Sequence, residues 1–534
     1  MSTRAIVRRS QVGRARQRGQ ALVFIGVTAV VVILALLATF NVGQMTFHRM
    51  KLQNTADAAV YSAAVAQARE LNFSAYMNRA VIANQVTVTQ LVSLAGWARN
   101  YENTYNGEFA SISQTFAGMS SLGAMWTVPF NGNKAVSSVA KPVLETAAQV
   151  GIPALEIAIT ALNGAAVAYH YAMTASIPAD LLPGVVKANE PEAAISTLGI
   201  AALAISAARH LTFTKQVTVT GNDPPDKNRM AYVTQASTDL FYKNRSLPPI
   251  WPLPMLIDPT RLFTYGFGPI LMMHFHSGGS SMKSGKDTAH LQGYSSLDAT
   301  GLFVVVSLTL VGPFGIPIPI VFPLPPLPAG TGAAFTGNSQ WGNSSSLQPF
   351  SNNIEHRNGN NTGVDPAAAV QFGAAHINPM TAIPAWIQTG EGPGSSFSSM
   401  SGIRNYMEVA DNVKNNQAQQ ATRSGTQNNY NDVAPAWVVE IERPGNKLLT
   451  TASGGYTIGG SGSGQLALPL SNGGGYYMRA MGRAEAYFRR PAKLFPRGDG
   501  KVEWGSTYSP YWQARLVKSG LAEQAASILR NALL

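Results

Sequence analysis

The feature that most constrains how this chain can fold is an apolar run at residues 21–40, which contains no charged residue and no proline. Thirteen of its twenty residues are Leu, Ile, Val or Phe. As a helix, the run would be about 30 Å long, which matches the hydrocarbon core of a membrane. The sequence therefore predicts a transmembrane helix, drawn over residues 21–42 when the flanking residues are included.

A basic tail precedes this run. The net charge of the chain is +12, and residues 1–20 carry six arginines and no acidic residue. Because basic segments stay in the cytoplasm, we expect the N-terminus inside the cell and the bulk of the chain on the far side of the membrane. The rest of the chain is only mildly basic, so no nucleic-acid partner is predicted. The six arginines are Arg4, Arg8, Arg9, Arg14, Arg16 and Arg18.

A cleaved signal peptide would share this basic start, but the apolar run is longer than the ~7–15 residues of a signal core. Residues 39–42 also lack a small-x-small cleavage pattern, so an anchor is the preferred interpretation. Residues 193–208 are too short to span and are predicted to form a buried helix. Seven prolines interrupt residues 302–330, which predicts a strand at 302–311 and then an extended proline-rich arm packed on its own domain.

The 52 residues from 44 to 95 contain neither glycine nor proline, which predicts a long helix of about 78 Å with a break near residues 72–74. Apolar side chains recur along it at alternating spacings of four and three, as in a packing seam. The partner of this seam is either a later part of the same chain or a different subunit, and both alternatives stay open. Glu70, Asn84 and Thr87 fall on the seam and weaken it. The seam positions are Leu52, Ala56, Ala59, Ala63, Ala66, Phe73, Met77, Ala80, Leu91 and Leu94.

The sequence pattern changes near residue 213, from one typical of helices before it to one typical of strands after it, so the predicted fold class is α+β. Helices are expected at 135–149, 154–175, 191–212, 401–420 and 511–533, and strands at 216–220, 302–311, 436–442 and 476–488. Fifty glycines and 32 prolines predict many turns. The expected regions are a tail (1–20), the membrane helix with its adjoining segment (21 to about 66), a helical stalk (44–213), a strand- and proline-rich region (214–330), a linker (331–400) and a mixed C-terminal domain (401–534).

Two short motifs flank the apolar run. Gly19 and Gln20 lie at its entry, and the string from Met50 to Ala59 follows it. Together with residues 484–491 and 509–516, this pattern resembles the TadE/TadG-like family of Flp (tight adherence) pilus-assembly proteins. The most specific positions of the second motif are Leu52, Gln53, Asn54, Ala56, Asp57 and Ala58.

The resemblance implies a single-pass inner-membrane protein with a structural role in pilus assembly or a related secretion apparatus, not an enzyme. Its expected partners are the lipid bilayer and other pilus or secretion subunits, in an unknown oligomeric state. If Gly19 were a prepilin-type cleavage site, Phe24 would stand where those proteins carry glutamate, so processing is not predicted. The Asp-x-Ser-x-Ser motif of metal-dependent adhesion domains is also missing from the sequence.

Sites for chemistry are weakly indicated. The absence of cysteine excludes thiolate metal sites and a cysteine nucleophile. His274 and His276 would share one face of a strand, with His290 further on, but no carboxylate stands at a diagnostic spacing. The segment 279–286 does not have phosphate-loop spacing, and Gly460-Ser461-Gly462 matches a nucleophile elbow only loosely. We therefore predict no metal, no cofactor and no catalytic residue.

An aromatic group near the C-terminus, formed by Trp504, Tyr508, Tyr511 and Trp512, could bind a glycan or a partner. Aromatic clusters more often complete a core, which is the preferred interpretation. Two alternatives to a structural role remain at this point: an anchored, extracytoplasmic metal-dependent hydrolase, and a surface adhesin.

Overall fold

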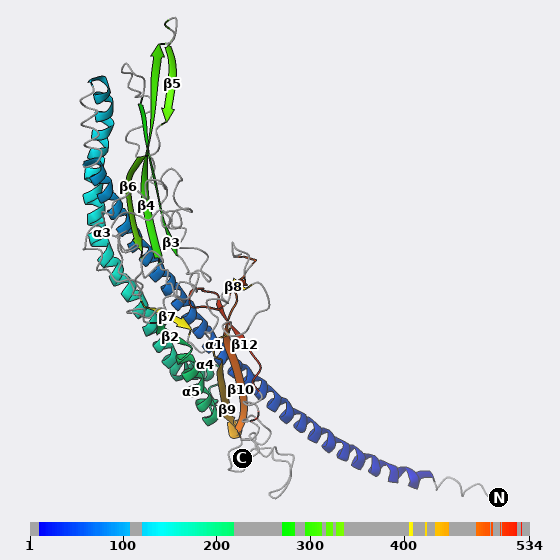
Figure 1. Cartoon of the computed structure of the whole chain (residues 1–534). Coiled ribbons are helices and arrows are strands. Elements are labelled where there is room, and N and C mark those ends of the chain that lie inside the picture. The colour runs from blue at the N-terminus through cyan, green and yellow to red at the C-terminus, as the bar shows by residue number, and fades with distance from the viewer. Residues whose placement is uncertain are drawn as a thin grey trace, which may run out of the picture.

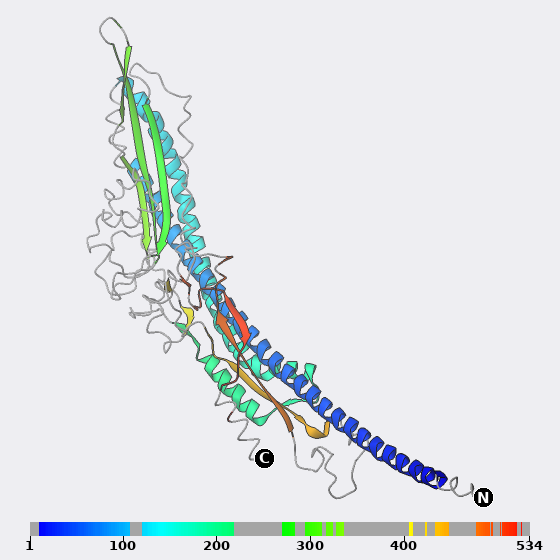
Figure 2. The same cartoon turned by 90° about the vertical axis from the view of Figure 1, so that its right-hand side faces the viewer.

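The computed structural model describes the backbone of residues 10–106, 120–217, 270–282, 294–311, 315, 317–323, 327–335, 405–409, 422–423, 433–447, 477–491, 493–494, 502–503, 505–520 and 525. It is an elongated molecule built along one very long helix, with two antiparallel sheets at different heights (Figures 1 and 2). The predicted α+β class is confirmed.

The long helix α1 runs from Ser10 to Asn106 without interruption. The expected break at residues 72–74 is wrong, because Asn72 and Ser74 find partners while the helical backbone stays regular. Helix α3 (Ser120–Ser176) lies beside the far part of α1 and unites the two helices expected at 135–149 and 154–175. The first part of α1 extends alone toward the N-terminus (Figures 1 and 2).

Short elements connect α3 to the first sheet: the π-helix η1 (Ile177–Leu181), α4 (Leu182–Asn189) and strand β1 (Ala194–Ile195). Helix α5 (Thr197–Leu211) follows. The predicted helix at 191–212 therefore starts too early. Ser196 caps α5, because its hydroxyl accepts a hydrogen bond from the amide of Gly199 at 3.0 Å.

The first sheet has the order β1-β9-β10-β12 and is antiparallel. Its longer strands are β9 (Trp437–Pro444) and β10 (Tyr477–Phe488), close to the predicted strands. Strand β12 (Trp512–Leu516) occupies the start of the predicted helix at 511–533, so that prediction is wrong there. Pairing with β10, from Phe488 opposite Trp512 onward, supplies hydrogen bonds that local helical periodicity could not reveal.

The second sheet lies along the distal part of α1 (Figure 1). It contains β3 (Ile270–Met282), β4 (Tyr294–Val311), β5 (Pro317–Pro323) and β6 (Leu327–Phe335). The predicted strand at 302–311 is the second half of β4, and the predicted proline-rich arm contains two strands that pair with it.

The prolines of β5 fit its edge position. Pro317, Pro319 and Pro323 fall on alternate residues, so their missing N–H groups all lie on the same side of the strand. The side that pairs with β4 can then keep its donors, which is why a proline-rich segment forms a strand here.

Two small ribbons complete the described backbone. Strand β2 (Thr214–Val217) pairs with β7 (Tyr406–Val409), and β8 (Thr422–Arg423) pairs with β11 (Val502–Glu503). A 3-10 turn, η8 (Gly445–Lys447), follows β9. The strand at β7 contradicts the helix expected at 401–420, whose residues 401–404 and 410–420 lie outside the described part.

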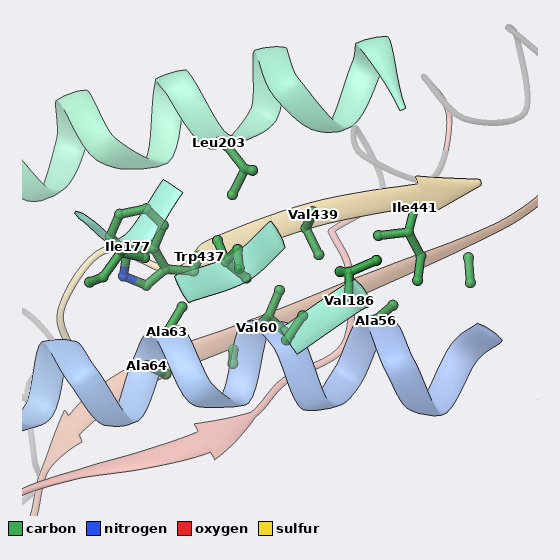
Figure 3. Close-up of a cluster of buried hydrophobic side chains, with 14 of the residues drawn as sticks. Ala56, Val60, Ala63, Ala64, Ile177, Val186, Leu203, Trp437, Val439 and Ile441 are labelled. Atoms are coloured by element: carbon green, nitrogen blue, oxygen red, sulfur yellow. The ribbon is translucent and has the colours of Figure 1, made fainter. Parts of the chain in front are cut away.

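One buried cluster joins α1 to the first sheet and to η1, α4 and α5 (Figure 3). The inward side chains of β9 are Trp437, Val439 and Ile441, each fully buried. Their spacing of two is that of one face of a strand. A separate apolar contact holds α1 to α3, and the ion pair between Arg99 and Glu145, at 2.7 Å, fastens the same two helices.

Candidate functional site

Residues 21–40 of α1 present an apolar surface that the other described residues leave largely uncovered. Phe24 is 73% exposed and Leu36 is 65% exposed. Among the described residues, two helical stretches, within Ala21–Arg99 and Lys134–Asn189, are long and apolar enough to cross a membrane by length and composition alone. The most apolar stretch of the first has no buried residue, whereas about a fifth of that of the second is buried and it runs beside α1.

The family-like string at residues 50–59 lies where α1 meets the first sheet. Leu52 and Ala56 are fully buried in the shared core. The Gln53 amide donates to the Met481 carbonyl of β10 at 2.9 Å and to Asp57 at 3.0 Å. A side chain on α1 thus binds directly to the backbone of a strand more than four hundred residues away.

Gly482 lets the helix and the strand approach closely. A Cβ atom at this position would stand 2.6 Å from the carbonyl oxygen of Ala56 and 3.0 Å from a methyl carbon of Val60. Real Cβ atoms do not come this near a backbone oxygen, so the contact requires glycine on β10. The small side chain of Ala56 provides the matching space on α1.

The remaining motif positions have varied surroundings. Asn54 is exposed, whereas Asp57 and Ala58 are half-buried. Burial raises the pKa of Asp57, and the hydrogen bond from Gln53 acts in the opposite direction. Gly19 and Gln20 lie within the α1 backbone, but their side chains are outside the described part.

The alanine-rich part of the predicted seam faces this chain's own core. Ala56, Ala59 and Ala63 are fully buried, and Ala66 is 8% exposed. All four belong to the cluster that contains β9, β10 and α5. Figure 3 shows Ala56 and Ala63 facing β9 in this cluster. For this stretch the structure answers the question that the sequence left open, because the neighbours come from the same chain.

A charged cluster stands beside the point where the exposed half of α1 ends. Arg443 of β9 donates to Glu190 at 2.6 Å and to the Lys447 carbonyl at 2.6 Å. Lys51 of α1 approaches the other oxygen of Glu190 at 2.9 Å. His48 lies 3.1 Å from Arg443. These contacts tie α1 to the end of the first sheet.

The most unusual group of polar side chains is buried one turn beyond the seam alanines. Glu70 of α1, His170 of α3 and His210 of α5 converge, and their exposed fractions are 0%, 2% and 0%. Glu70 Oε1 lies 3.0 Å from His170 Nδ1, and Glu70 Oε2 lies 3.5 Å from His210 Nε2. We call these three residues the Glu–His–His cluster.

The cluster is supported by neighbouring polar groups. Gln67 Nε2 lies 3.0 Å from His210 Nδ1, and Thr214 Oγ1 lies 3.2 Å from His170 Nδ1. Burial lowers the pKa of His170, but the hydrogen bond and charge of Glu70 outweigh it and leave the pKa raised. Burial lowers the pKa of His210 to about 4, although the Glu70 charge acts to raise it.

Sequence reasoning missed this cluster, because Glu70 was interpreted as a defect in the apolar seam and the two histidines were not singled out. A carboxylate on a seam that is otherwise buried was the available signal, since buried carboxylates require partners.

The site candidates named from sequence lie elsewhere. His274 and His276 stand on β3, opposite Leu302 and Thr300, with side chains outside the described part. His290, Gly460, Ser461, Gly462 and Trp504 also lie outside it. Tyr508 and Trp512 are buried, and Trp512 packs with Phe213 and Phe488, so these aromatic residues complete a core.

A comparison with known protein families finds a match that lies within α1. Residues 19–67 match the model described as putative Flp pilus-assembly TadE/G-like. This part of the chain is similar to TadE/G-like proteins, and we call it the TadE/G-like segment. The match covers the exposed apolar part of α1 and the part that packs on the first sheet, as far as Gln67. The match supports a role in Flp pilus assembly. No curated protein and no solved structure matches the chain.

Proposed function

We propose that this chain is a membrane-anchored structural component of an Flp-type pilus or a related secretion apparatus. The observation that carries the proposal is the division of α1: its apolar half is exposed, and its second half is enclosed by the chain's own sheet and helices. The TadE/G-like segment spans both halves. One rigid helix would then connect the bilayer to the folded region.

The proposed topology places residues 1–20 in the cytoplasm, residues 21–42 in the bilayer and the remainder outside. An uncovered apolar helix of this length has a strong drive to leave water, and the arginines before it favour retention inside. The proposal also keeps the division of the remainder into a helical stalk (44–213), a strand- and proline-rich region (214–330), a linker (331–400) and a C-terminal domain (401–534). Pilus or secretion subunits are the proposed partners, and no enzymatic step is assigned.

Protease protection on intact spheroplasts tests the topology, with one tag before Arg4 and another after Leu534. We expect the C-terminal tag to be digested while the N-terminal tag survives on a product that only detergent extracts. A soluble product that lacks the first forty residues would show a cleaved signal peptide and overturn the anchor.

The pilus role is tested separately, by deletion of the gene and by crosslinking in membranes. We expect loss of pili in the deletion strain and recovery of pilus or secretion subunits with the tagged chain. Normal piliation together with no such subunit in the crosslinked material would reject the role, even if the anchor were correct.

In the described residues, nothing favours the hydrolase or the adhesin over this role. The Glu–His–His side chains are enclosed, and the C-terminal aromatic residues that are described fill a core.

A further inference from the structure

The Glu–His–His cluster brings together three helices that are distant in sequence. Glu70, His170 and His210 each offer one ligand atom, and these atoms all lie within 4.8 Å of one another. All three side chains are shielded from solvent. An arrangement of this kind is costly to bury unless the charge of the carboxylate is compensated.

The compensation visible in the structure is incomplete. Glu70 Oε1 has its partner in His170, but Glu70 Oε2 faces His210 Nε2 at 3.5 Å. That separation is longer than an ordinary N–H···O hydrogen bond of about 2.7–3.2 Å. Within the described part of the chain, neither of these two buried atoms has a hydrogen-bond partner. A carboxylate oxygen and an imidazole nitrogen therefore point at the same small space.

The donor set and the spacing fit zinc. Tetrahedral zinc, with bonds of about 2.0–2.2 Å, separates neighbouring ligand atoms by roughly 3.3–3.6 Å. Glu70 Oε1 lies 3.0 Å from His170 Nδ1, Glu70 Oε2 lies 3.5 Å from His210 Nε2, and the three ligand atoms lie within 4.8 Å of one another, so small side-chain shifts would bring them to tetrahedral spacing. Two imidazoles with one carboxylate form a known zinc ligand set, whereas calcium and magnesium prefer shells of six or more oxygens.

The surrounding groups can orient such ligands. His170 Nε2 lies 3.4 Å from the Leu211 carbonyl, so a proton there would leave Nδ1 free to bind a metal. Thr214 Oγ1 lies 3.2 Å from Nδ1 and 3.4 Å from Nε2 of the same ring, so it borders the imidazole, and a water molecule would complete the ligand set. For His210 Nε2 to bind the metal, the proton of the ring must be on His210 Nδ1. The Gln67 amide must then turn its oxygen toward that Nδ1 proton to accept it. That oxygen is buried and without a partner in the described residues, although turning it gives up the bond to the Pro435 carbonyl.

We propose that Glu70, His170 and His210 bind one zinc ion, which fastens α1, α3 and α5 together. The role is structural, because Glu70, His170 and His210 are shielded from solvent by the described residues and leave no open approach for a substrate. The proposal does not depend on the proposed function, since it concerns the internal architecture of the folded region.

The test uses the full-length chain in detergent micelles, stripped with a chelator and then dialysed against zinc sulfate or cobalt sulfate. We expect one zinc per chain by elemental analysis and a higher unfolding temperature than in the stripped protein. Cobalt should give the visible absorption of a tetrahedral nitrogen and oxygen site, and zinc should abolish it. These measurements need no variant.

Variants then assign the ligands. Glu70→Gln and His210→Gln should each weaken zinc binding about tenfold or more, while His48→Gln, on the same helix as Glu70, should bind like the wild type. Circular dichroism checks that each variant is folded. A stripped wild type that takes up no zinc or cobalt, or folded Glu70 and His210 variants with undiminished affinity, would overturn the proposal.

Discussion

Residues 21–50 and residues 52–98 belong to one uninterrupted helix, yet their surroundings are opposite. In the first half, side chains as large as Phe24 and Leu36 are exposed. In the second half, even alanines such as Ala59 and Ala63 are fully buried. The comparison shows that one helix can have two kinds of apolar surface, a bulky one suited to lipid and a small one suited to a close protein neighbour.

The difference lies in what each surface needs. In the proposed topology the exposed half lies among lipid tails, which are fluid and accommodate large branched side chains, so no matching shape is required. A sheet that packs on a helix has a fixed shape, and here Gly482 and Ala56 together allow the close contact. The two halves should therefore respond differently to the same kind of substitution.

The largest effect is expected from a charge in the buried half. Ala59→Arg would place an unpaired guanidinium and extra volume among β9, β10 and α5, and should destabilise the fold by about 4–5 kcal/mol. Tyr61→Arg, two residues away at a position that is 45% exposed, should change stability by no more than about 0.5 kcal/mol. Denaturant unfolding of the full chain in micelles measures both, and equal stabilities would contradict the assigned buried face.

Removing the close approach between β10 and α1 should have the next largest effect. Gly482→Ala forces a methyl group against the Ala56 carbonyl and should cost about 3 kcal/mol. Gly184→Ala in α4 meets no atom within 4 Å and should be neutral or stabilising by up to about 1 kcal/mol. Thermal unfolding compares the pair, and a harmless Gly482→Ala would mean that α1 does not dock this closely.

A charge in the exposed half should act on membrane insertion and leave the packed core unchanged. Val31→Arg is expected to cost about 2.5–3.5 kcal/mol at the centre of a span, whereas Val31→Leu should insert normally. Carbonate extraction of membranes reports the inserted fraction. Full retention of the arginine variant in the membrane pellet would argue that this half is covered by protein.

Substitutions at the junction between the two halves, where Lys51 and Arg443 pair with Glu190, should have the smallest effects on stability. The two substitutions should differ in their cost. Arg443→Ala removes a largely buried partner of Glu190 and should cost about 2–3 kcal/mol, since Lys51 remains beside the carboxylate. Lys51→Ala, at a side chain that is 44% exposed, should cost less than about 1 kcal/mol. Denaturant unfolding of the two variants checks the order, and a reversed order would show that the charged cluster is assembled differently.

The elements that sequence predicted well depend on local information. Residues 44–95 lack glycine and proline, so a long helix was expected, and β9 and β10 were found within a few residues of their bounds. The errors come from segments whose partners are remote. Strand β12 exists because it pairs with β10, and β7 because it pairs with β2, and neither pairing is written in local periodicity.

The candidate site divides in the same way. The string at residues 50–59 was legible, but its contact with Met481 and Gly482 was not. Glu70 was visible only as an oddity on the seam. Its meaning emerged when the fold brought His170 and His210, one hundred or more residues later, to within hydrogen-bond or metal-binding range.

By itself, the sequence determined the helical course of α1 and the apolar character of residues 21–40, because both follow from the residues present within a few turns. Tertiary structure alone decided which surface covers the seam alanines and why β10 needs glycine at position 482. It also decided that Glu70 meets two histidines. The physical reason is that helix formation and membrane partition are summed along the chain, whereas packing and buried polar contacts depend on residues that only folding makes neighbours.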